Sequence, residues 1–526
     1  MNKAIFAVLL GACSPFDEGG RTASDPVAPV PGPTDPCNAL GLPKVALQAG
    51  TGEARLDIAG DFTVRTQDGP WTFSEAFTGC ETYLFLPSVQ SQVGRVIWDD
   101  DGLEFRERLP ANTHVFFVST DSDRAEIDAD LAVVQDAVEE GLKKLPEAEE
   151  DAVRRRLHYV TTGLPDLQDE WVGRLLVSPG YGFGIDRAQR IRDIGMLGAA
   201  PSFSDDFSQN AWEAVHYNWE AERDAKSAAD GATVVPSFVG AVVEDSGWAG
   251  IRTYADVRLP SAEEMGAFDT LTLDLSMECV GPGEVGTCPE WDRIVEVWLC
   301  QVDDPDVCDI EIGRWISAYS REGRWLSDAS YLLPLLADGG TRRLAAYSID
   351  PYELTLDFRL STQGVPKPAA TEVVWRGFPG MDDNYLANFP SREVWIPANA
   401  THTELSVVVT GHGMSPGLNC AEFCDTKHIF TVNGVTQTIS FPQTGELEDC
   451  QDQTFSGTIP NQYGTWWYGR ANWCPGKVVA PLVLDFTDAV TPGSFADVSY
   501  TAEGPQGPMP GGGATIDLSV FLTSRR

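Results

Sequence analysis

Apolar and polar positions follow two different patterns along the chain. In the first half, apolar runs at residues 82–86 and 114–120 predict buried strands. Between residues 123 and 145, apolar residues recur at helical spacing with charges on the opposite face, which predicts an amphipathic helix. Residues 181–195 predict a strand, a turn and a second strand. This half therefore mixes strands with helices.

The pattern changes after a polar segment. Residues 205–230 favour a helix that links two parts of the chain. Beyond them, short β-rich runs separated by Gly, Pro, Asn and Asp continue to the C-terminus, which is typical of antiparallel all-β sandwiches. Roughly 300 residues of this pattern exceed one sandwich. Residues 361–370, which contain Pro and Gly, offer a natural boundary between two of them.

We therefore expect a multidomain protein. Its parts are an α/β domain at residues 37–204, a linker helix at 205–231, and all-β sandwiches at 232–365 and 366–526. The order of elements in the first part resembles a thioredoxin-like domain. The redox cysteines of that family would follow the first core strand, where residues 86–94 (LPSVQSQVG) hold no cysteine. A structural or docking role is thus expected for this domain, rather than thiol chemistry.

The N-terminus predicts export. Residues 1–13 have a basic start and an apolar run too short to span a bilayer, followed by Leu-Gly-Ala-Cys13. This ending resembles a bacterial lipobox, in which the cysteine is lipidated; the alternative is a simple secretion signal with a chance cysteine. Residues 14–36 are rich in Pro, Gly, Ser and Asp and predict a flexible linker. We expect a bacterial cell-envelope protein, secreted or lipid-anchored, with Ser14 favouring the outer membrane.

The net charge of the chain limits the classes of molecule that we expect it to bind. The 526 residues include 37 Lys and Arg against 78 Asp and Glu, which gives a formal net charge of −41. A chain this acidic is repelled by nucleic-acid phosphates and by anionic bilayer surfaces. We therefore expect no nucleic-acid partner, and membrane contact only through the N-terminal lipid.

Cysteine usage agrees with an exported protein. Without Cys13, ten of the eleven cysteines remain, which allows five disulfides in an oxidising compartment. Proximity in the sequence predicts the pairs Cys37–Cys80, Cys279–Cys288, Cys300–Cys308, Cys420–Cys424 and Cys450–Cys474. A structural zinc site is the alternative, but no tandem Cys-x-x-Cys knuckle favours it.

The first segment with candidate chemistry is residues 278–300 (ECVGPGEVGTCPEWDRIVEVWLC). A Gly-rich loop, closed by the predicted disulfide, leads into a predicted strand. On such a strand Glu290 and Asp292 would share one face, with Trp291 and Arg293 on the other. Two acids this close raise the pKa of one of them, which suits a general base. The alternative is an acidic face turned to solvent.

Two further segments carry polar groups beside unusual loops. In residues 411–428, Cys420 and Cys424 bracket Glu422, so a disulfide between them would hold the Glu422 backbone. In residues 465–476 (TWWYGRANWCPG), four aromatic residues surround one arginine. Flat rings suit sugar faces, and a planar guanidinium suits an acid or an amide oxygen. Packing of this loop against a core is the alternative.

Together the three segments resemble the peptide-N-glycosidase F family. The family's Cys-x-Glu-Trp-Asp-Arg is matched at residues 288–293, and its Cys-Ala-Glu-Trp-Cys at residues 420–424, with Phe423 in place of Trp. Its Asp-Arg-Ala-Gly-Trp-Cys-Pro-Gly is matched at residues 469–476 with two substitutions. The segments keep the family's order over about residues 232–526. The resemblance implies two eight-stranded jelly rolls side by side, with the site in the cleft between them.

The resemblance also implies catalytic roles. Asp292 falls on the family's principal catalytic aspartate and Glu422 on the glutamate of its disulfide loop. Asp292 would activate or orient a water molecule beside the scissile amide, while Glu422 would hold the first GlcNAc and the amide in register. No metal or other cofactor is implied.

Substrate-binding residues are implied in the same way. Arg293 and Arg470 fall on site arginines of the family, and Trp473 on an aromatic residue near the substrate. Trp291 and His412 complete the candidate set. The tryptophan that precedes the site histidine in the family has no clear counterpart near His412.

The family's third acidic residue has an uncertain counterpart at residues 344–354 (LAAYSIDPYEL). A gapless match places Ile349 there, and a shift of one residue places Asp350. An aspartate is one methylene shorter than a glutamate, and Pro351 stiffens the loop. We keep Asp350 as a candidate catalytic residue.

The resulting expectation is hydrolysis of the bond between Asn and the first GlcNAc of N-linked glycoproteins or glycopeptides, by a monomer. The products would be Asp and a glycosylamine. One alternative is a catalytically silent glycan-binding lipoprotein, motivated by the altered region around Asp350. Another is a copper monooxygenase, which needs clustered histidines. The β region offers His402, His412 and His428, none in His-x-His spacing.

Overall fold

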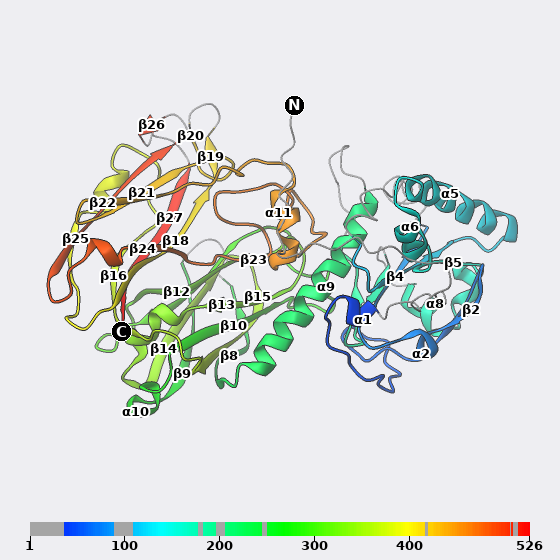
Figure 1. The fold of residues 1–526 in the computed structure, drawn as a ribbon, viewed down its shortest axis with the longest axis horizontal. Coiled ribbons are helices and arrows are strands. Elements are labelled where there is room, and N and C mark those ends of the chain that lie inside the picture. Colours follow the sequence, from blue (N-terminus) through cyan, green and yellow to red (C-terminus); the bar gives the residue numbers. More distant parts are fainter. Residues whose placement is uncertain are drawn as a thin grey trace, which may run out of the picture.

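The protein was analysed as a computed structural model, which describes residues 36–88, 109–176, 182–195, 206–244, 250–415, 419–504, 507–508 and 514–526. A mixed α/β domain lies on one side of the long helix α9 (Asp206–Ala229), and two β-sandwiches lie on the other (Figure 1). The predicted signal peptide, with Cys13, lies outside the described residues. Within those residues, no helix combines the length and apolar character that a bilayer-spanning segment needs.

The N-terminal domain is built on a seven-stranded mixed sheet of order β2-β1-β5-β4-β3-β6-β7. Its strands are β1 (Thr63–Thr66), β2 (Gly69–Thr72), β3 (Thr82–Pro87), β4 (Thr113–Val118), β5 (Leu157–Val160), β6 (Phe183–Ile185) and β7 (Ile191–Asp193). β4 runs parallel to β3 and β5, β6 is antiparallel to β3, and β7 is antiparallel to β6. The two predicted buried strands are thus β3 and β4, and the predicted strand pair at residues 181–195 is β6 and β7.

Both faces of this sheet are apolar because side chains alternate along a strand. Leu84 and Leu86 of β3 join the core under the helices, whereas Tyr83 and Phe85 join the opposite core. The predicted amphipathic helix is α5 (Arg124–Leu142), and the Asp123 side chain caps it by accepting a hydrogen bond from the Ala125 amide. The domain's other helices are α1 (Pro36–Ala39), α2 (Phe73–Ala76), α6 (Glu147–Arg154), α7 (Leu164–Leu167) and α8 (Trp171–Leu176).

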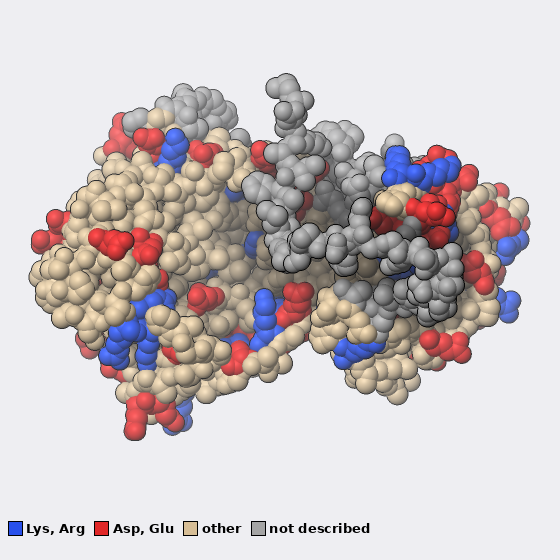
Figure 2. All heavy atoms as spheres, viewed as in Figure 1, with Lys and Arg blue, Asp and Glu red and all other residues tan. Residues whose placement is uncertain are grey.

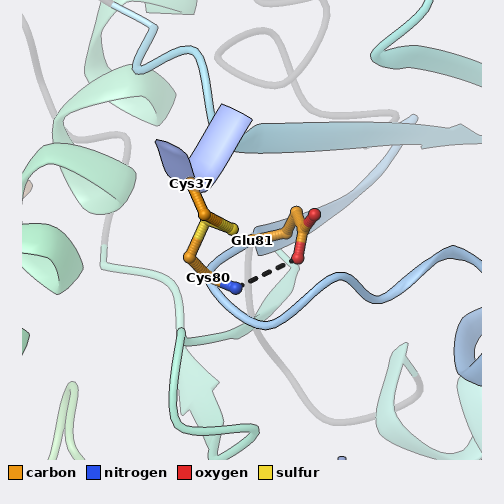
Figure 3. Close-up of side chains that lie close together, drawn as sticks. All are labelled: Cys37, Cys80 and Glu81. Carbon is orange, nitrogen blue, oxygen red and sulfur yellow. Dashed lines mark hydrogen bonds between the residues drawn. A yellow bond between two sulfur atoms is a disulfide. The ribbon is translucent and has the colours of Figure 1, made fainter. Parts of the chain in front are cut away.

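A disulfide fixes the first described segment to the sheet. Cys37 of α1 is bonded to Cys80, which lies just before β3 (Figure 3). The neighbouring carboxylate of Glu81 is buried and accepts hydrogen bonds from three backbone amides, those of Thr78, Gly79 and Cys80, at 2.9, 3.0 and 3.2 Å. Residues 37–204 contain no other cysteine, so this domain carries no free thiol.

Helix α9 is more than the polar linker that the sequence indicates. Its Glu213 is fully buried and accepts hydrogen bonds from Gly195 of the N-terminal domain (2.8 Å), Arg321 of the first sandwich (2.9 Å) and Asn461 of the second (2.9 Å). One carboxylate therefore joins all three parts of the molecule.

The first sandwich packs a four-stranded sheet, β13-β10-β15-β8, on a five-stranded sheet, β23-β12-β11-β14-β9. Its elements are β8 (Thr233–Val243), β9 (Thr253–Ser261), α10 (Ala262–Met265), β10 (Thr270–Glu278), β11 (Ile294–Cys300), β12 (Cys308–Ile316), β13 (Gly323–Asp328), η1 (Ser330–Leu336), β14 (Gly339–Ser348) and β15 (Tyr352–Ser361). β23 comes from the second half of the chain and pairs with β12.

The second sandwich packs the sheet β16-β27-β18-β24 on the sheet β17-β25-β21-β22. Its elements are β16 (Pro368–Gly377), η2 (Tyr385–Asn388), β17 (Arg392–Trp395), β18 (His402–His412), β19 (Met414–Ser415), β20 (Asn419–Cys420), β21 (Lys427–Val432), β22 (Val435–Ile439), α11 (Asp449–Asp452), η3 (Gln453–Ser456), β24 (Leu482–Asp485), η4 (Thr487–Ala489), β25 (Phe495–Gly504), β26 (Gly507–Pro508) and β27 (Thr515–Arg525). β23 (Lys477–Val478), which precedes β24 in the chain, belongs to the sheet of the first sandwich. The predicted boundary at residues 361–370 coincides with the connection from β15 to β16.

Burial patterns show how the sandwiches meet. β10 alternates strictly between buried and half-buried residues, which is the pattern of a strand with one face on a core. β11, β18 and β27 are instead buried nearly throughout, so both of their faces are covered. Arg314 of β12 donates to Thr410 of β18 and to the Asp517 carbonyl of β27, both at 2.9 Å. The two sandwiches therefore pack through these strands.

Charged side chains are dispersed over the face in Figure 2. Acidic and basic residues form small separate groups there, and most of the described surface over the two sandwiches is neither acidic nor basic. The formal charge of −41 is thus not gathered into one patch on this described face.

Candidate active site

A cleft of about 680 Å³ lies where the two sandwiches meet. Its lining comes from β11 and the loop before it, from the end of β14, and from β16, β18, β27 and the loop after β20. Five of the candidate residues line it: Asp292, Arg293, His412, Glu422 and Trp473. A concave site with convergent polar groups is where a ligand is expected to bind.

The prediction of a strand over residues 290–293 is wrong, because β11 begins at Ile294. Pro289 has no amide hydrogen to donate to a sheet, and the Arg293 amide donates to the Ser317 hydroxyl at 2.8 Å rather than to a strand neighbour. The segment is a loop in which Glu290 is exposed to solvent and only Asp292 reaches the cleft.

Asp292 is a carboxyl group held in a nearly dry position. Its side chain is 12% exposed, its Oδ2 lies 3.4 Å from Nη2 of Arg470, and it shares a hydrogen bond with the Tyr319 hydroxyl. Burial raises its pKa to about 6, helped by the charge of Glu422 and opposed by Arg470 and Tyr319. The acid that raises the pKa of Asp292 is therefore Glu422, 130 positions away, and not Glu290 as the sequence predicts.

Arg470 joins the two candidate carboxylates from behind the cleft. Its fully buried side chain places Nη2 at 3.4 Å from Asp292 and Nε at 3.4 Å from Oε1 of Glu422. Nη1 donates to the Tyr468 carbonyl at 2.9 Å, and Nη2 to the Thr465 carbonyl at 3.2 Å. The planar fork of the guanidinium thus sets the spacing of the two acids.

Glu422 is fixed by its own short loop. The disulfide between Cys420 and Cys424 closes the loop, and Oε2 of Glu422 accepts a hydrogen bond from the Gly413 amide at 3.0 Å. Gly413 has φ of +72°, a left-handed conformation that side chains other than glycine's rarely adopt, and it follows directly on β18. The carboxylate is therefore held against the end of a strand of the second sandwich.

Trp473 and His412 form an aromatic wall of the cleft. Their rings stack at 5.1 Å, and the Trp473 indole donates to the Gly411 carbonyl at 2.7 Å. His412 bonds the Thr410 hydroxyl at 2.7 Å, and burial lowers the pKa of His412 to about 3, so its ring is neutral. Asn472, where the family's motif has glycine, adopts φ of +63°, which asparagine tolerates better than most residues.

The remaining candidates lie at the edge of the site. Nε of Arg293 donates to Oδ2 of Asp350 at 3.2 Å, and Arg293 lies 5.8 Å from the ring of Trp291, which is 52% exposed. Ile349 lines the cleft, whereas Asp350 does not. The structure thus places Asp350 beside Arg293 and does not bring it together with Asp292 and Glu422.

Sequence reasoning missed several residues of the site. Tyr319 contacts both Asp292 and Arg470, the latter at 3.4 Å, and Thr465 accepts from Arg470. Four further charged residues also line the cleft: Arg252, Glu296, Arg376 and Asp517. Alternation along β11 could have indicated Glu296, since the residues on either side of it face the core. No local signal marks Arg376 or Asp517, which come from other strands.

All five predicted disulfides are present, so the zinc alternative for these ten cysteines is wrong. The described residues also offer no set of ligands that would fit the copper alternative. Among the described residues, the groups able to surround a metal ion contain no histidine, and two of the three consist largely of disulfide sulfurs. His402, His412 and His428 bond to separate partners, Glu404, Thr410 and Tyr500.

Comparisons with known proteins bear on this site. The family model described as "Peptide-N-glycosidase F, C terminal" matches residues 384–511. The solved structure of PNGase F, a glycosylasparaginase from Flavobacterium meningosepticum, is 19% identical, with 56% of this chain and 96% of that chain covered and a TM-score of 0.45. A structure of PNGF-II is 12% identical, with 65% and 74% covered and a TM-score of 0.43. No curated protein matches the chain.

The matched residues contain the second half of the site. Residues 384–511 supply Gly413, Glu422, Arg470 and Trp473, together with the disulfides Cys420–Cys424 and Cys450–Cys474. The match therefore falls on the sandwich that holds one candidate carboxylate and the arginine that joins it to the other. The family model thus relates this sandwich, over residues 384–511, to the C-terminal domain of peptide-N-glycosidase F.

Proposed function

We propose that this protein hydrolyses the amide bond between Asn and the first GlcNAc of N-linked glycoproteins or glycopeptides. The observation that carries the proposal is the pair of carboxylates, Asp292 and Glu422, held at 3.4 Å from two nitrogens of Arg470 beside one cleft. Each comes from a different sandwich, so the pair exists only when the two sandwiches pack together.

Asp292 is the candidate general base. With a pKa of about 6 it is mostly ionised at neutral pH, yet basic enough to take a proton from a water molecule. That water attacks the carbonyl carbon of the Asn side chain. The C–N bond then breaks, the proton passes from Asp292 to the departing nitrogen, and the products are an Asp side chain and a glycosylamine.

The other residues would position the substrate. Glu422, with a side chain 21% exposed, can accept a hydrogen bond from the sugar or from the scissile amide. The Trp473 and His412 rings offer flat apolar faces of the kind that pack on sugar rings. Because the His412 ring is neutral, it adds no positive charge to the cleft.

The architecture supports two finer proposals. When the two-residue β26 is left out, the first strand of each sandwich pairs with the last and the second with the last but one: β8 with β15, β9 with β14, β16 with β27 and β17 with β25. We infer that both are jelly rolls, which pair their strands in this way. The order β4-β3-β6-β7, with β6 antiparallel to its neighbours, supports a thioredoxin-like scaffold for the N-terminal domain.

Export is part of the same proposal. The N-terminal sequence supports a signal with lipidation at Cys13, and five disulfides favour an oxidising compartment. We propose a cell-envelope protein, lipid-anchored or secreted, that acts as a monomer on exported or extracellular glycoproteins.

The test is incubation of the purified protein with a denatured N-glycoprotein and with a short N-glycopeptide. Asp292→Asn should lower kcat/KM by about 10²–10⁴-fold, the usual contribution of general-base catalysis. Glu290→Gln is the matched control, since it removes an exposed acid two positions away and should leave the rate unchanged. Intact glycan on both substrates after treatment with the wild-type protein would refute the proposal.

One observation favours the alternative of a glycan-binding protein without turnover. The cleft presents Ile349 where the gapless match to the family expects an acid. Binding of a free chitobiose probe that is equal in the wild type and Asp292→Asn, with no hydrolysis by either, would support that alternative.

A further inference from the structure

The cleft contains a second group of charged residues that the proposed reaction does not use. Glu296 of β11, Arg376 of β16 and Asp517 of β27 all line it. Behind them lie Glu311 and Arg314 of β12, both buried. Glu296 is four positions beyond Asp292, and both residues line the same cleft.

The group is held together by close ion pairs. Nη2 of Arg376 lies 3.0 Å from Oε1 of Glu296, and its Nη1 lies 2.7 Å from Oδ1 of Asp517. Arg314 lies 2.9 Å from Asp517 and 2.7 Å from Glu311. One carboxylate oxygen from each of Glu296, Glu311 and Asp517 lies within 4.8 Å of the other two.

The charges do not balance if every acid is ionised. Three carboxylates would be paired with two guanidinium groups, and the remaining negative charge would be buried. Arg252, which also lines the cleft, lies over the Trp298 ring and forms no ion pair with these carboxylates among the described residues. Three negative charges this close to one another repel, which favours a proton shared between two of the carboxyl groups. The neighbouring His412, on β18, supplies no positive charge, since burial and Arg314 keep its ring neutral.

We propose that Glu296 and Asp517 share one proton and form a subsite that binds a neutral polar group of the glycan, either a hydroxyl or an acetamido carbonyl. This inference rests on the proposed function. A protonated carboxyl both donates and accepts hydrogen bonds, so the subsite suits an uncharged sugar and disfavours an anionic one.

The proton is expected to stay in place at neutral pH. Burial raises the pKa of Glu296 well above its ordinary value, and the nearby charges of Asp517 and Glu311 raise it further. Burial likewise raises the pKa of Asp517, against the opposing charges of Arg314 and Arg376. The pair therefore titrates as a unit, and the pKa for loss of its last proton is raised.

Trp298 gives independent support for a ligand at this place. It lines the cleft next to Glu296 along β11 and is 95% buried, because its exposed fraction is 5%. The guanidinium groups of Arg376 and Arg252 lie over its ring at 4.5 and 5.1 Å. Its indole Nε1 has no hydrogen-bond partner among the described residues, which is uncommon for a buried donor.

The test compares two substitutions at one position. Glu296→Gln keeps the shape and the neutral, hydrogen-bonding character of a protonated glutamate, whereas Glu296→Ala removes them. On an N-glycopeptide, Glu296→Gln should leave KM within about threefold of wild type, and Glu296→Ala should raise KM about tenfold with little change in kcat, as expected for loss of one hydrogen bond. Thermal unfolding of each variant shows whether it folds, and Asp517→Asn, with the same expected KM as Glu296→Gln, gives a second measurement.

The pH dependence separates this role from a structural one. The wild-type KM should rise as pH rises and the shared proton is lost, whereas the KM of Glu296→Gln should stay constant. Equal damage by Glu296→Gln and Glu296→Ala, or no effect of either on KM, would overturn the proposal. Calorimetric titration of chitobiose into variants that also carry Asp292→Asn measures binding at the subsite without turnover. A failure of the subsite proposal can therefore be distinguished from a failure of the amidase proposal.

Discussion

Asp292 illustrates how a single carboxyl acquires its chemistry from distant parts of the chain. Its own loop buries it, Arg470 pairs with it, and Glu422 adds a like charge from the other sandwich. Burial is the largest of these effects and raises the pKa of Asp292, while Arg470 limits the rise. The result is a carboxyl group whose pKa suits the proposed role of general base.

The raised pKa predicts the acid limb of the pH–rate profile. Because the base must be ionised, kcat/KM on an N-glycopeptide should fall as pH decreases through about 6, with the full rate above that value. Steady-state kinetics between pH 4.5 and 8 would measure it. A flat profile down to the ordinary aspartate range near 4 would contradict this assignment of the base.

At the scale of elements, short disulfide-closed loops and buried strands determine where the side chains lie. The loop closed by Cys420 and Cys424 holds Glu422 against the end of β18. The backbone of this loop is tied to the neighbouring loop by the Ala471 amide, which donates to the Glu422 carbonyl at 2.9 Å. The position of the Glu422 carboxylate therefore depends on a disulfide between two cysteines that are four positions apart in the sequence.

Removal of this disulfide should affect activity more than stability. We expect the double variant Cys420→Ala/Cys424→Ala to lose about 10–100-fold in kcat/KM, because misplacement of a positioned group by about 1 Å costs on that order. The variant Cys37→Ala/Cys80→Ala, which lacks the disulfide of the N-terminal domain, is the control and should retain kcat/KM after correction for folded protein. Equal losses in both would show that the Glu422 loop does not depend on its disulfide.

The N-terminal sheet holds a second element-scale feature. His114 of β4 and His158 of β5 are hydrogen-bonded at 2.9 Å and stacked at 5.2 Å. Burial lowers the pKa of each to about 3, so the folded domain keeps both rings neutral. The unfolded chain binds protons near pH 6.5, so their contribution to stability is present above that pH and is lost as pH falls from 6.5 toward 3.

The lowered pKa values of the two histidines predict how the free energy of unfolding changes with pH. Each histidine contributes up to about 1.4 kcal/mol of unfolding free energy per pH unit in that range. The variant His158→Gln should therefore lose less stability than wild type between pH 6.5 and 4, as measured by denaturant unfolding. The control His402→Gln, at a ring that is one third exposed, should keep the wild-type slope. Identical slopes for all three proteins would contradict the assignment.

Much of the fold and of the candidate site could be predicted from the sequence, and the features that could not be predicted have physical causes. The cysteine pairs followed from proximity, and β3, β4 and α5 followed from apolar spacing, because these are local properties. The pairing of Asp292 with Glu422 could be inferred only from resemblance, since it depends on how two sandwiches pack. The error at residues 290–293 arose because the backbone amide of Arg293 donates to the Ser317 hydroxyl instead of to a neighbouring strand. Asp517 and Arg376 carry no local pattern at all.

At the scale of the whole molecule, a buried ionic network ties the N-terminal domain to the two sandwiches. Glu213 bonds to groups of all three parts, and Arg192 of β7 pairs with Glu220 of α9 and Glu284 of the first sandwich. Such pairs do not by themselves prove stability, but loss of one partner leaves a buried charge unpaired. The three parts should therefore unfold together.

Glu213→Ala tests this coupling. It leaves Arg321 without its closest carboxylate and should lower the free energy of unfolding by about 3–5 kcal/mol, with the single wild-type transition split into two. Glu222→Ala, an exposed position on the same helix, is the control and should change little. A single unshifted transition for Glu213→Ala would show that the domains are not coupled through this residue.

The central claim is that one cleft between two sandwiches directs water onto an asparagine-linked amide. Mass spectrometry of an N-glycopeptide treated in heavy-oxygen water tests it most directly. The account predicts that the peptide product carries Asp in place of the glycosylated Asn, with one oxygen atom from the solvent in its side chain, and that Asp292→Asn yields none. Release of glycan that leaves Asn or Asn-GlcNAc on the peptide would contradict it.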